Sequence, residues 1–508
     1  MRQARKNQEI KMPKIVKNIP IMDLLAYLIE TVDSPTHVGT LQIFEPGAES
    51  AAEAVQRVLD AYRSCEVAPP FNYYPVFPRF AMPKWAAADA FDVDYHIRHM
   101  AVPLPGTDRQ LIDMAMDLHA GMMDRSRPGW IAYVIEGLQD NCFAVYWKVH
   151  HAYIDGASAV MRMEAAMSKT PADKTIRPLW SPLFEQSASE DSPSLSDLLR
   201  KASKGVGTQG RALADVSRAI GRAINQARGE SQRQAPVPFS APHSVFNQPV
   251  FATRKLGVGD MPLDRFKAVA RREGVSINEV ALTLVGAALE RYCARHGQQP
   301  EKPLLAACPM ALRSPGDTDA STQIASISVK LGDQGVDIHE RLRQVHNSSK
   351  DAKEDARDMS REALVNYLIL LGGAATLLSK SPLSTYIPPL TSVNVSNVAG
   401  PSYRCYHGGA ELIRSYPLST LAGGTAINIT FTSASGRMDF AVVSDARAVP
   451  GAQEIADLIC AAMDELEAVT VGGKLTAGKA RAKRKAPAKP KARRAAATPK
   501  RTSAARAQ

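Results

Sequence analysis

The sequence predicts a mixed α/β protein of two domains joined by a long crossover, and three observations lead to this prediction. A chain of 508 residues is longer than one hydrophobic core usually organises. Its 45% hydrophobic content is that of an ordinary globular protein. Strand-like and helix-like apolar patterns occur in residues 18–185 and again in residues 250–470, with linker-like sequence over residues 186–249.

The first predicted domain, residues 18–185, contains a strand, a turn and a helix in succession. Large apolar side chains alternate along residues 143–149, which is the period of a strand with one buried face. Residues 156–167 contain good helix formers and no proline. Between the two lies His150-His151-Ala152-Tyr153-Ile154-Asp155-Gly156, so the histidines are expected where the strand ends.

The linker and the second domain have equally simple patterns. Within the linker, the helical spacing of Leu213, Val216, Ile220 and Ile224 predicts a long amphipathic crossover helix over residues 198–227. The second domain, residues 250–470, is expected to hold a buried helix over residues 277–292. Strands are expected near residues 326–331, 391–395, 426–431 and 438–443.

The two ends of the chain are basic. Residues 1–17 form a basic extension without the apolar core and cleavage site of a signal peptide. Residues 471–508 hold thirteen Lys and Arg residues and no acidic residue, so the rest of the chain, with 49 basic and 51 acidic residues, carries a formal charge of −2. This composition predicts a disordered tail. Three roles stay open for it: adhesion to anionic phospholipid on a membrane or lipid inclusion, nucleic-acid association as the weaker option, or simple solubilisation.

The sequence also indicates the compartment. Six cysteines are scattered without Cys-x-x-Cys spacing, which argues against a disulfide framework or a zinc site and favours a reducing cytoplasm. The most apolar run, residues 363–378, falls short of the roughly 20 residues that span a bilayer. We therefore expect a cytoplasmic protein, and a peripheral position at the inner membrane or at lipid inclusions stays open. That run is interpreted as a buried helix or as one that lies against lipid.

The two histidines suit general-base catalysis of acyl transfer. An alcohol attacking a thioester must lose its proton as the new bond forms, and histidine has an ordinary pKa near 6.5 that matches this task. Because adjacent side chains of an extended backbone point in opposite directions, one histidine should face a cavity and the other the interior. His151 is predicted to be the base and His150 its support. Asp155 is predicted either to orient the imidazole or to pair with a distant arginine, and Gly156 permits a tight turn.

Two other interpretations of the histidine pair stay open. The pair could be structural, or it could be part of a metal site. No second cluster with ligand spacing stands out in the sequence, so no metal and no cofactor are expected.

Around the histidines, several ordered blocks resemble the bacterial wax ester synthase/acyl-CoA:diacylglycerol acyltransferase family, whose signature is His-His-x-x-x-Asp-Gly. The similarity runs from about residue 19 to about residue 468. The blocks are residues 22–30, 36–44, 123–130, 134–138, 278–279, 309–313 and 397–401.

This resemblance implies a fold and an activity. The fold would be two chloramphenicol-acetyltransferase-like domains, with the histidine motif on a tunnel between them. The activity would be acyl-CoA-dependent O-acylation of diacylglycerol or a long-chain fatty alcohol to triacylglycerol or wax ester, with acyl-CoA as substrate and no covalent acyl-enzyme. Because the short motif also occurs in peptide-synthetase condensation domains, an amide-forming enzyme stays open as an alternative, as does a catalytically weak lipid-inclusion or nucleic-acid-binding protein.

The chain departs from the family blocks at three positions. Gly129 stands where the Pro-Leu-Trp block has leucine, between Pro128 and Trp130, and is expected to loosen the backbone. Glu279 replaces an aspartate, and Ala399 replaces a proline and is expected to free a turn.

Four residues of these blocks are predicted to bind substrate or to support the site structurally: Pro128, Trp130, Asn278 and Asn397. Asn278 is either a helix cap or packing residue or part of the interdomain site. Asn397 is either a turn residue or a donor near the tunnel.

Overall fold

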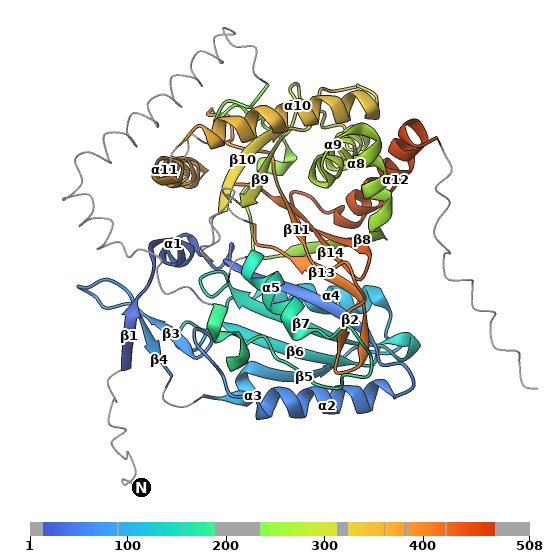
Figure 1. Ribbon diagram of the computed structural model, residues 1–508. Coiled ribbons are helices and arrows are strands. Elements are labelled where there is room, and N and C mark those ends of the chain that lie inside the picture. Colours follow the sequence, from blue (N-terminus) through green and yellow to red (C-terminus); the bar gives the residue numbers. More distant parts are fainter. Residues whose placement is uncertain are drawn as a thin grey trace, which may run out of the picture.

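The computed structural model describes residues 14–88, 91–154, 156–187, 234–311, 324–359, 361–379, 381, 384, 386–421 and 424–472. Two six-stranded mixed sheets lie one above the other, each with helices against it (Figure 1). The predicted mixed α/β architecture with two sheet-bearing units is therefore confirmed.

The first sheet has the strand order β12-β13-β2-β7-β6-β5, and a small sheet of order β1-β4-β3 stands beside it. The elements of the first part of the chain are β1 (Lys14–Asn18), α1 (Ile21–Ile29), β2 (His37–Glu45), α2 (Ala51–Ser64), β3 (Tyr73–Val76), β4 (Lys84–Ala87), α3 (Val93–His96), β5 (Ile97–Ala101), α4 (Asp108–Ala120), β6 (Trp130–Glu136), β7 (Phe143–His150) and α5 (Gly156–Ala166), with 3-10 turns at Gln139–Asn141 and Pro182–Ser187.

The second sheet has the strand order β10-β9-β11-β14-β15-β8. Its part of the chain contains a 3-10 turn at Val245–Asn247, then β8 (Arg254–Pro262), α8 (Leu263–Glu273), α9 (Ile277–Arg295), β9 (Leu305–Ala311), β10 (Ile324–Lys330), α10 (Ile338–Arg357), α11 (Arg361–Ser379), β11 (Val393–Ala399), β12 (Tyr406–His407), β13 (Ala410–Leu418), β14 (Ile427–Ala434), β15 (Arg437–Asp445) and α12 (Ala452–Thr470).

Strand β7 is confirmed, but both of its faces are buried, whereas its alternating sequence predicted one buried face. Phe143, Val145, Trp147 and Val149 pack in an aromatic core together with buried residues of α2, whereas Ala144 and Tyr146 face the opposite side of the sheet. All four tryptophans of the chain, at positions 85, 130, 147 and 180, belong to this aromatic core. The packing of β7 therefore fixes the position of its C-terminal end, where the two histidines lie.

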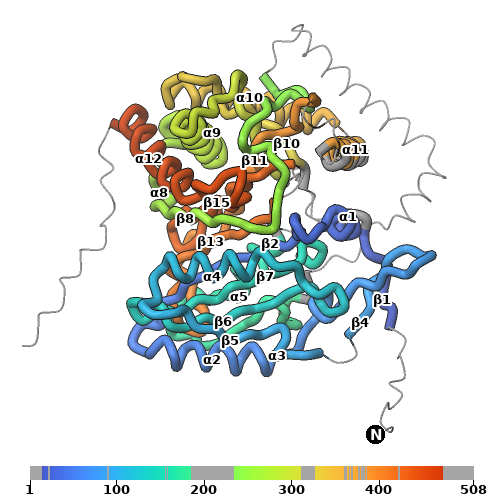
Figure 2. The backbone as a smooth tube through the Cα atoms, turned by 180° about the vertical axis from the view of Figure 1, so that it is seen from behind, coloured from blue at the N-terminus to red at the C-terminus, as the bar shows by residue number. Residues whose placement is uncertain are grey.

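A separate apolar core joins the two sheets. It contains Leu111 and Met116 of α4, Tyr146 of β7, Leu256 of β8 and Val443 of β15, so α4 lies between the first sheet and the edge of the second. Figure 2 shows α4 and β8 on this side of the molecule. Burial of this surface fixes the two halves relative to each other.

Strands β12 and β13 come from the second half of the chain but lie in the first sheet. Strand β13 pairs antiparallel with β2, with Tyr416 opposite Leu41. The backbone N–H of Ser415 also donates to the buried Asp439 of β15, 2.7 Å away, and burial raises the pKa of that carboxyl to about 6. The sequence did not predict this crossover, because an alternating pattern identifies a strand and not its partner.

The other expected elements have mixed outcomes. The helix over residues 277–292 and the four strands of the second half are confirmed as α9, β10, β11, β14 and β15. The apolar run at 363–378 lies in α11, with Ala363 buried and Leu370 exposed. The predicted crossover helix at 198–227 and the tail beyond residue 472 lie outside the described residues. Among the residues that are described, no helix is both long enough and apolar enough to cross a bilayer.

Candidate active site

The histidine motif forms a tight turn at the end of β7. The backbone N–H of His150 donates to Gly129 O (2.8 Å), and that of His151 donates to Thr36 O (2.9 Å). The N–H of Tyr153 then donates back to His150 O (2.9 Å). Three segments distant in sequence therefore hold the turn.

Both ring nitrogens of His150 are used inside the protein. The N–H of Ala152 donates to Nδ1 (3.2 Å), so the imidazole proton lies on Nε2. Nε2 faces the hydroxyl of Thr36 at 3.0 Å, and this hydroxyl donates its own proton to Ala26 O (2.9 Å). His150 is thereby held as one tautomer with its lone pair occupied.

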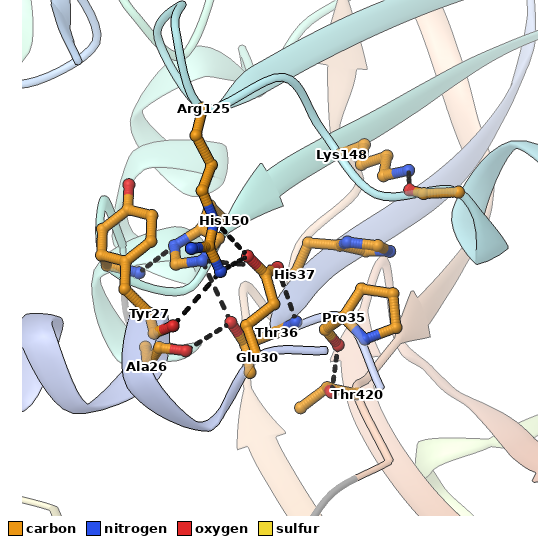
Figure 3. A network of polar contacts seen from close by, with 12 residues as sticks. Ala26, Tyr27, Glu30, Pro35, Thr36, His37, Arg125, Lys148, His150 and Thr420 are labelled. Carbon is orange, nitrogen blue, oxygen red and sulfur yellow. Dashed lines mark hydrogen bonds and ion pairs between the residues drawn. The ribbon is translucent and has the colours of Figure 1, made fainter. Parts of the chain in front are cut away.

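A buried carboxylate completes the surroundings of His150 (Figure 3). Glu30 Oε1 lies 3.6 Å from His150 Nε2 and accepts the backbone N–H of Thr36 at 3.1 Å. Its Oε2 accepts from Nε and Nη2 of Arg125, at 3.0 and 2.7 Å. Burial would raise the pKa of Glu30, but the nearby His150 and the hydrogen bonds from Arg125 outweigh it and bring the value to about 2.

The aromatic ring of Tyr27 covers the face of His150. The two rings stack with centroids 4.0 Å apart and an interplanar angle of 13°. Arg125 lies over the ring of Tyr27 and also donates to Tyr27 O at 3.2 Å. Helix α1 and the loop after α4 therefore both hold the imidazole in place.

His151 has the opposite environment from His150. Its side chain is exposed, whereas that of His150 is buried, as the alternation along the strand predicts. The following helix α5 begins against the second sheet, because a methyl group on Gly156 would lie 4.0 Å from Val398 Cγ2 in β11. The motif thus sits where the two sheets meet. Asp155 lies outside the described residues, so its predicted contact with an imidazole stays a prediction.

The end of α4 is fastened beneath the turn by side chains of β2 and β7. Lys148 donates to Leu118 O at 2.8 Å and to Gly121 O, and His37 donates from Nε2 to His119 O. Cations and donors at a helix C-terminus satisfy its unpaired carbonyl groups. Burial lowers the pKa of Lys148 to about 7.

A small cavity of about 10 Å³ adjoins His37 at the junction of the two halves. It is lined by His37 of β2, by His119 of α4, and by Arg254 and residues 419–421 from the second half of the chain. Such a volume is that of a single water molecule and far too small for an acyl chain.

The Pro128-Gly129-Trp130 block supports the turn from below. Trp130 is fully buried and donates from its indole nitrogen to Phe71 O at 2.7 Å. That Gly129 loosens the backbone stays a prediction, but the structure shows which residue fills the space beside it. A Cβ atom there would lie 2.7 Å from Tyr153 Cε2 and 3.1 Å from His150 Cβ, so Tyr153 occupies the space of a larger residue. Pro128 is buried directly before it.

Asn278 and Glu279 lie at the start of α9, where Ser276 is the cap. The hydroxyl of Ser276 accepts the N–H of Glu279 (3.3 Å), so Asn278 is not the cap, and its role in packing or in the interdomain site stays a prediction. The Glu279 carboxylate also contacts His346 (3.0 Å) and Lys353 (2.8 Å) of α10. Burial opposes ionisation, but these partners bring the pKa of Glu279 to about 2. Its role in the structure is to fasten α9 to α10.

Asn397 and Ala399 lie in strand β11, which corrects the expectation of a turn at these positions. Asn397 pairs with Phe431 of β14 and is half-buried, and Ala399 is the exposed last residue of the strand. The chain turns only after them, at Gly400, whose N–H donates to Ser433 Oγ at 3.1 Å.

Sequence reasoning missed the groups that surround His150. Glu30, Thr36 and Tyr27 belong to blocks quoted for the family resemblance, but nothing in their local pattern indicates contact with a residue more than 100 positions later. One signal was available in the sequence. The two histidines follow a strand of buried residues, and the histidine that points into the interior needs hydrogen-bond partners for its ring. In the parts of the chain that the structure describes, no three His, Cys, Asp or Glu side chains form a metal-binding group.

The second half of the chain contributes β12 and β13 to the first sheet, and the His-His-x-x-x-Asp-Gly turn lies at the junction of the two sheets. These features define a two-domain acyltransferase of the chloramphenicol-acetyltransferase-like fold. The first condensation domain of the CDA synthetase has the same fold, with a TM-score of 0.53 over 89% of this chain and 96% of that one. At 12% identity this likeness shows the fold alone.

Within that class, residues 20–281 match the wax ester synthase/diacylglycerol acyltransferase catalytic domain, and residues 320–467 match the C-terminal domain of the same family. This chain belongs to that family. The wax ester synthase/diacylglycerol acyltransferase from Marinobacter aquaeolei VT8 has a TM-score of 0.70 at 28% identity, covering 90% of this chain and all of that one.

Two curated relatives have similar extents. A putative diacylglycerol O-acyltransferase of Mycobacterium tuberculosis is 32% identical, covering 88% of this chain and 98% of the relative. The O-acyltransferase WSD of Acinetobacter baylyi is 30% identical, covering 85% of this chain and 93% of the relative. The predicted O-acyltransferase class is thus confirmed.

Proposed function

We propose that this protein transfers a long acyl chain from acyl-CoA to the hydroxyl group of diacylglycerol or a long-chain alcohol, with His151 as the general base. The observation that carries the assignment of the base is the contrast between the two histidines. His150 uses both ring nitrogens in internal hydrogen bonds, whereas the side chain of His151 is exposed at the junction of the sheets.

The proposed reaction has two steps. His151 accepts the hydroxyl proton while the oxygen attacks the thioester carbonyl carbon, which gives a tetrahedral intermediate. The carbon–sulfur bond then breaks, and the imidazolium returns the proton to the departing thiolate, releasing the ester and CoA. General-base assistance of this kind contributes roughly 10²- to 10⁴-fold in rate.

His150 is a positioning residue in this proposal. Its ring orients the Ala152 N–H and so the turn that carries His151, and Glu30 and Thr36 fix that ring. Pro128 and Trp130 support the same turn through Gly129 O. No metal or cofactor takes part in this scheme.

The test is CoA release by the purified full-length protein with palmitoyl-CoA and either hexadecanol or dioleoylglycerol. We expect acceptor-dependent CoA release by the wild type and a loss of roughly 10²-fold or more in His151→Ala. Absence of CoA release with every alcohol would refute the activity. Full activity of His151→Ala would refute the base.

A further inference from the structure

The small sheet and α1 carry an unusual group of exposed apolar side chains. Phe80 is 92% exposed and Leu28 is 64% exposed. Ile15, Val16, Phe77 and Met82 are each more than 40% exposed. Soluble surfaces rarely gather such residues in one place, and clusters of them mark interaction sites. We call these six residues the apolar tip.

The apolar tip lies on a projecting hairpin, on the strand beside it and on α1. Strand β1 pairs with β4, with Ile15 opposite Ala86, and β3 pairs with β4 up to Val76 opposite Lys84, so residues 77–83 form the end of the hairpin. Tyr27 of α1 contacts Phe77 with ring centroids 5.6 Å apart, and Leu28 is the next residue of this helix. Figures 1 and 2 show this hairpin projecting from the edge of the molecule in both views.

The charged residues of β1 and of the hairpin are all basic. Residues 14–18 and 73–88 contain Lys14, Lys17, Arg79 and Lys84 and no Asp or Glu. Arg79 lies over the ring of Phe80 at 5.4 Å. Basic residues near an anionic lipid surface strengthen binding to it.

We propose that the apolar tip docks this protein on an anionic phospholipid surface. The interleaving of Phe, Leu and Ile with Lys and Arg is that of interfacial membrane segments, whose apolar side chains enter the boundary of the acyl chains while the cations stay at the headgroups. The centre of a protein–protein interface is instead depleted in lysine. The apolar tip differs from the basic tail, because apolar side chains would supply most of its binding to lipid.

Ring contacts connect the apolar tip to the histidine turn. Phe77 contacts Tyr27, which stacks on His150, and Trp85 of β4 packs edge-on against Tyr153 at 4.9 Å. Docking through the apolar tip would therefore bring the histidine turn close to lipids dissolved in the bilayer. This consequence rests on the proposed function, whereas docking itself is measured without turnover.

The test uses tryptophan as a depth reporter in the full-length chain. The four native tryptophans are at most 3% exposed, so Phe80→Trp adds a reporter at the tip, and Leu104→Trp adds a matched control at a 91% exposed site elsewhere. Vesicles contain phosphatidylcholine and phosphatidylglycerol in equal amounts, with brominated acyl chains. We expect strong quenching in Phe80→Trp and none beyond the wild type in Leu104→Trp. Equal quenching in the two variants, or none in Phe80→Trp, would overturn the proposal.

A second measurement separates the tip from the tail. In about 0.5 M NaCl the Debye length is roughly 4 Å, so tail electrostatics are largely screened. Under these conditions Phe80→Ser/Met82→Ser should bind the same vesicles at least tenfold more weakly than the wild type, and Leu104→Ser should match the wild type. Unchanged binding by the double variant would contradict docking through the tip. Phe80-dependent self-association without vesicles would assign the tip to a second copy of the chain instead.

Discussion

Glu30→Gln removes the charge next to His150 and keeps the shape of the side chain. The Glu30 side chain is 2% exposed, and its partners lower its pKa from 4.5 to about 2. That difference corresponds to a ceiling of about 3 kcal/mol of stability at neutral pH. Because the Arg125 side chain is 37% exposed and keeps access to water, we expect a loss of about 2 kcal/mol at pH 7.

The pH dependence of this loss has a defined sign. The folded-state pKa of Glu30 lies below its unfolded value, so its contribution is fully present above pH 4.5 and is lost as the pH falls toward 2. Most of it has gone by about pH 3. Since glutamine does not titrate, the stability gap between wild type and Glu30→Gln should narrow to less than about 1 kcal/mol at that pH.

Urea unfolding followed by tryptophan fluorescence measures this gap. All four tryptophans lie in the aromatic core of the first sheet, so the signal reports the half that contains Glu30. Glu49→Gln is the matched control, because it removes a carboxylate paired with Arg57 (2.6 Å) at a more exposed site of the same half and should cost less than about 1 kcal/mol. Equal unfolding midpoints for wild type and Glu30→Gln at pH 7, or a gap that does not change with pH, would refute the reasoning.

Three further predictions test other parts of the account. Gly129→Leu should lower the melting temperature and the turnover, because a side chain at this position would collide with Tyr153. The double variant Gly129→Leu/Tyr153→Ala should recover part of both, and no recovery would show that the two residues do not compete for the same space. Glu279→Asp should lower thermal stability by about 1 kcal/mol, because the shorter arm cannot keep both Ser276 and Lys353, and should leave turnover unchanged; a large loss of turnover would place Glu279 in the site. Deleting residues 471–508 should weaken binding to anionic vesicles at low salt and leave turnover of soluble substrates intact, and unchanged binding would reject adhesion through the tail.

The sequence predicted the local parts of the site better than its long-range parts. A period of two along β7 identified the strand, and the opposite directions of adjacent side chains separated a buried His150 from an exposed His151. Glu30 and Thr36 could not be found in this way, because their contacts with His150 depend on how α1 and β2 pack against β7.

Two further features show why the rest could not be predicted. Strand β13 lies beside β2 because the edge of the first sheet at β2 is available to it in the folded chain. The alternating pattern of β13 would be the same for any other partner strand, so the sequence could not identify β2. From the sequence, Gly129 could be judged only by its own flexibility, whereas the structure shows that the ring of Tyr153 fills the space beside it.

The most direct test of the central claim, that His151 is the base and His150 its support, is chemical rescue. His151→Gly and His150→Gly are each assayed for CoA release with palmitoyl-CoA and hexadecanol, with and without added imidazole, and their unfolding midpoints are measured. We predict that imidazole restores activity to a stably folded His151→Gly, and that His150→Gly is destabilised and is not rescued. Full activity of His151→Gly without imidazole, together with rescue of a stably folded His150→Gly, would contradict the account.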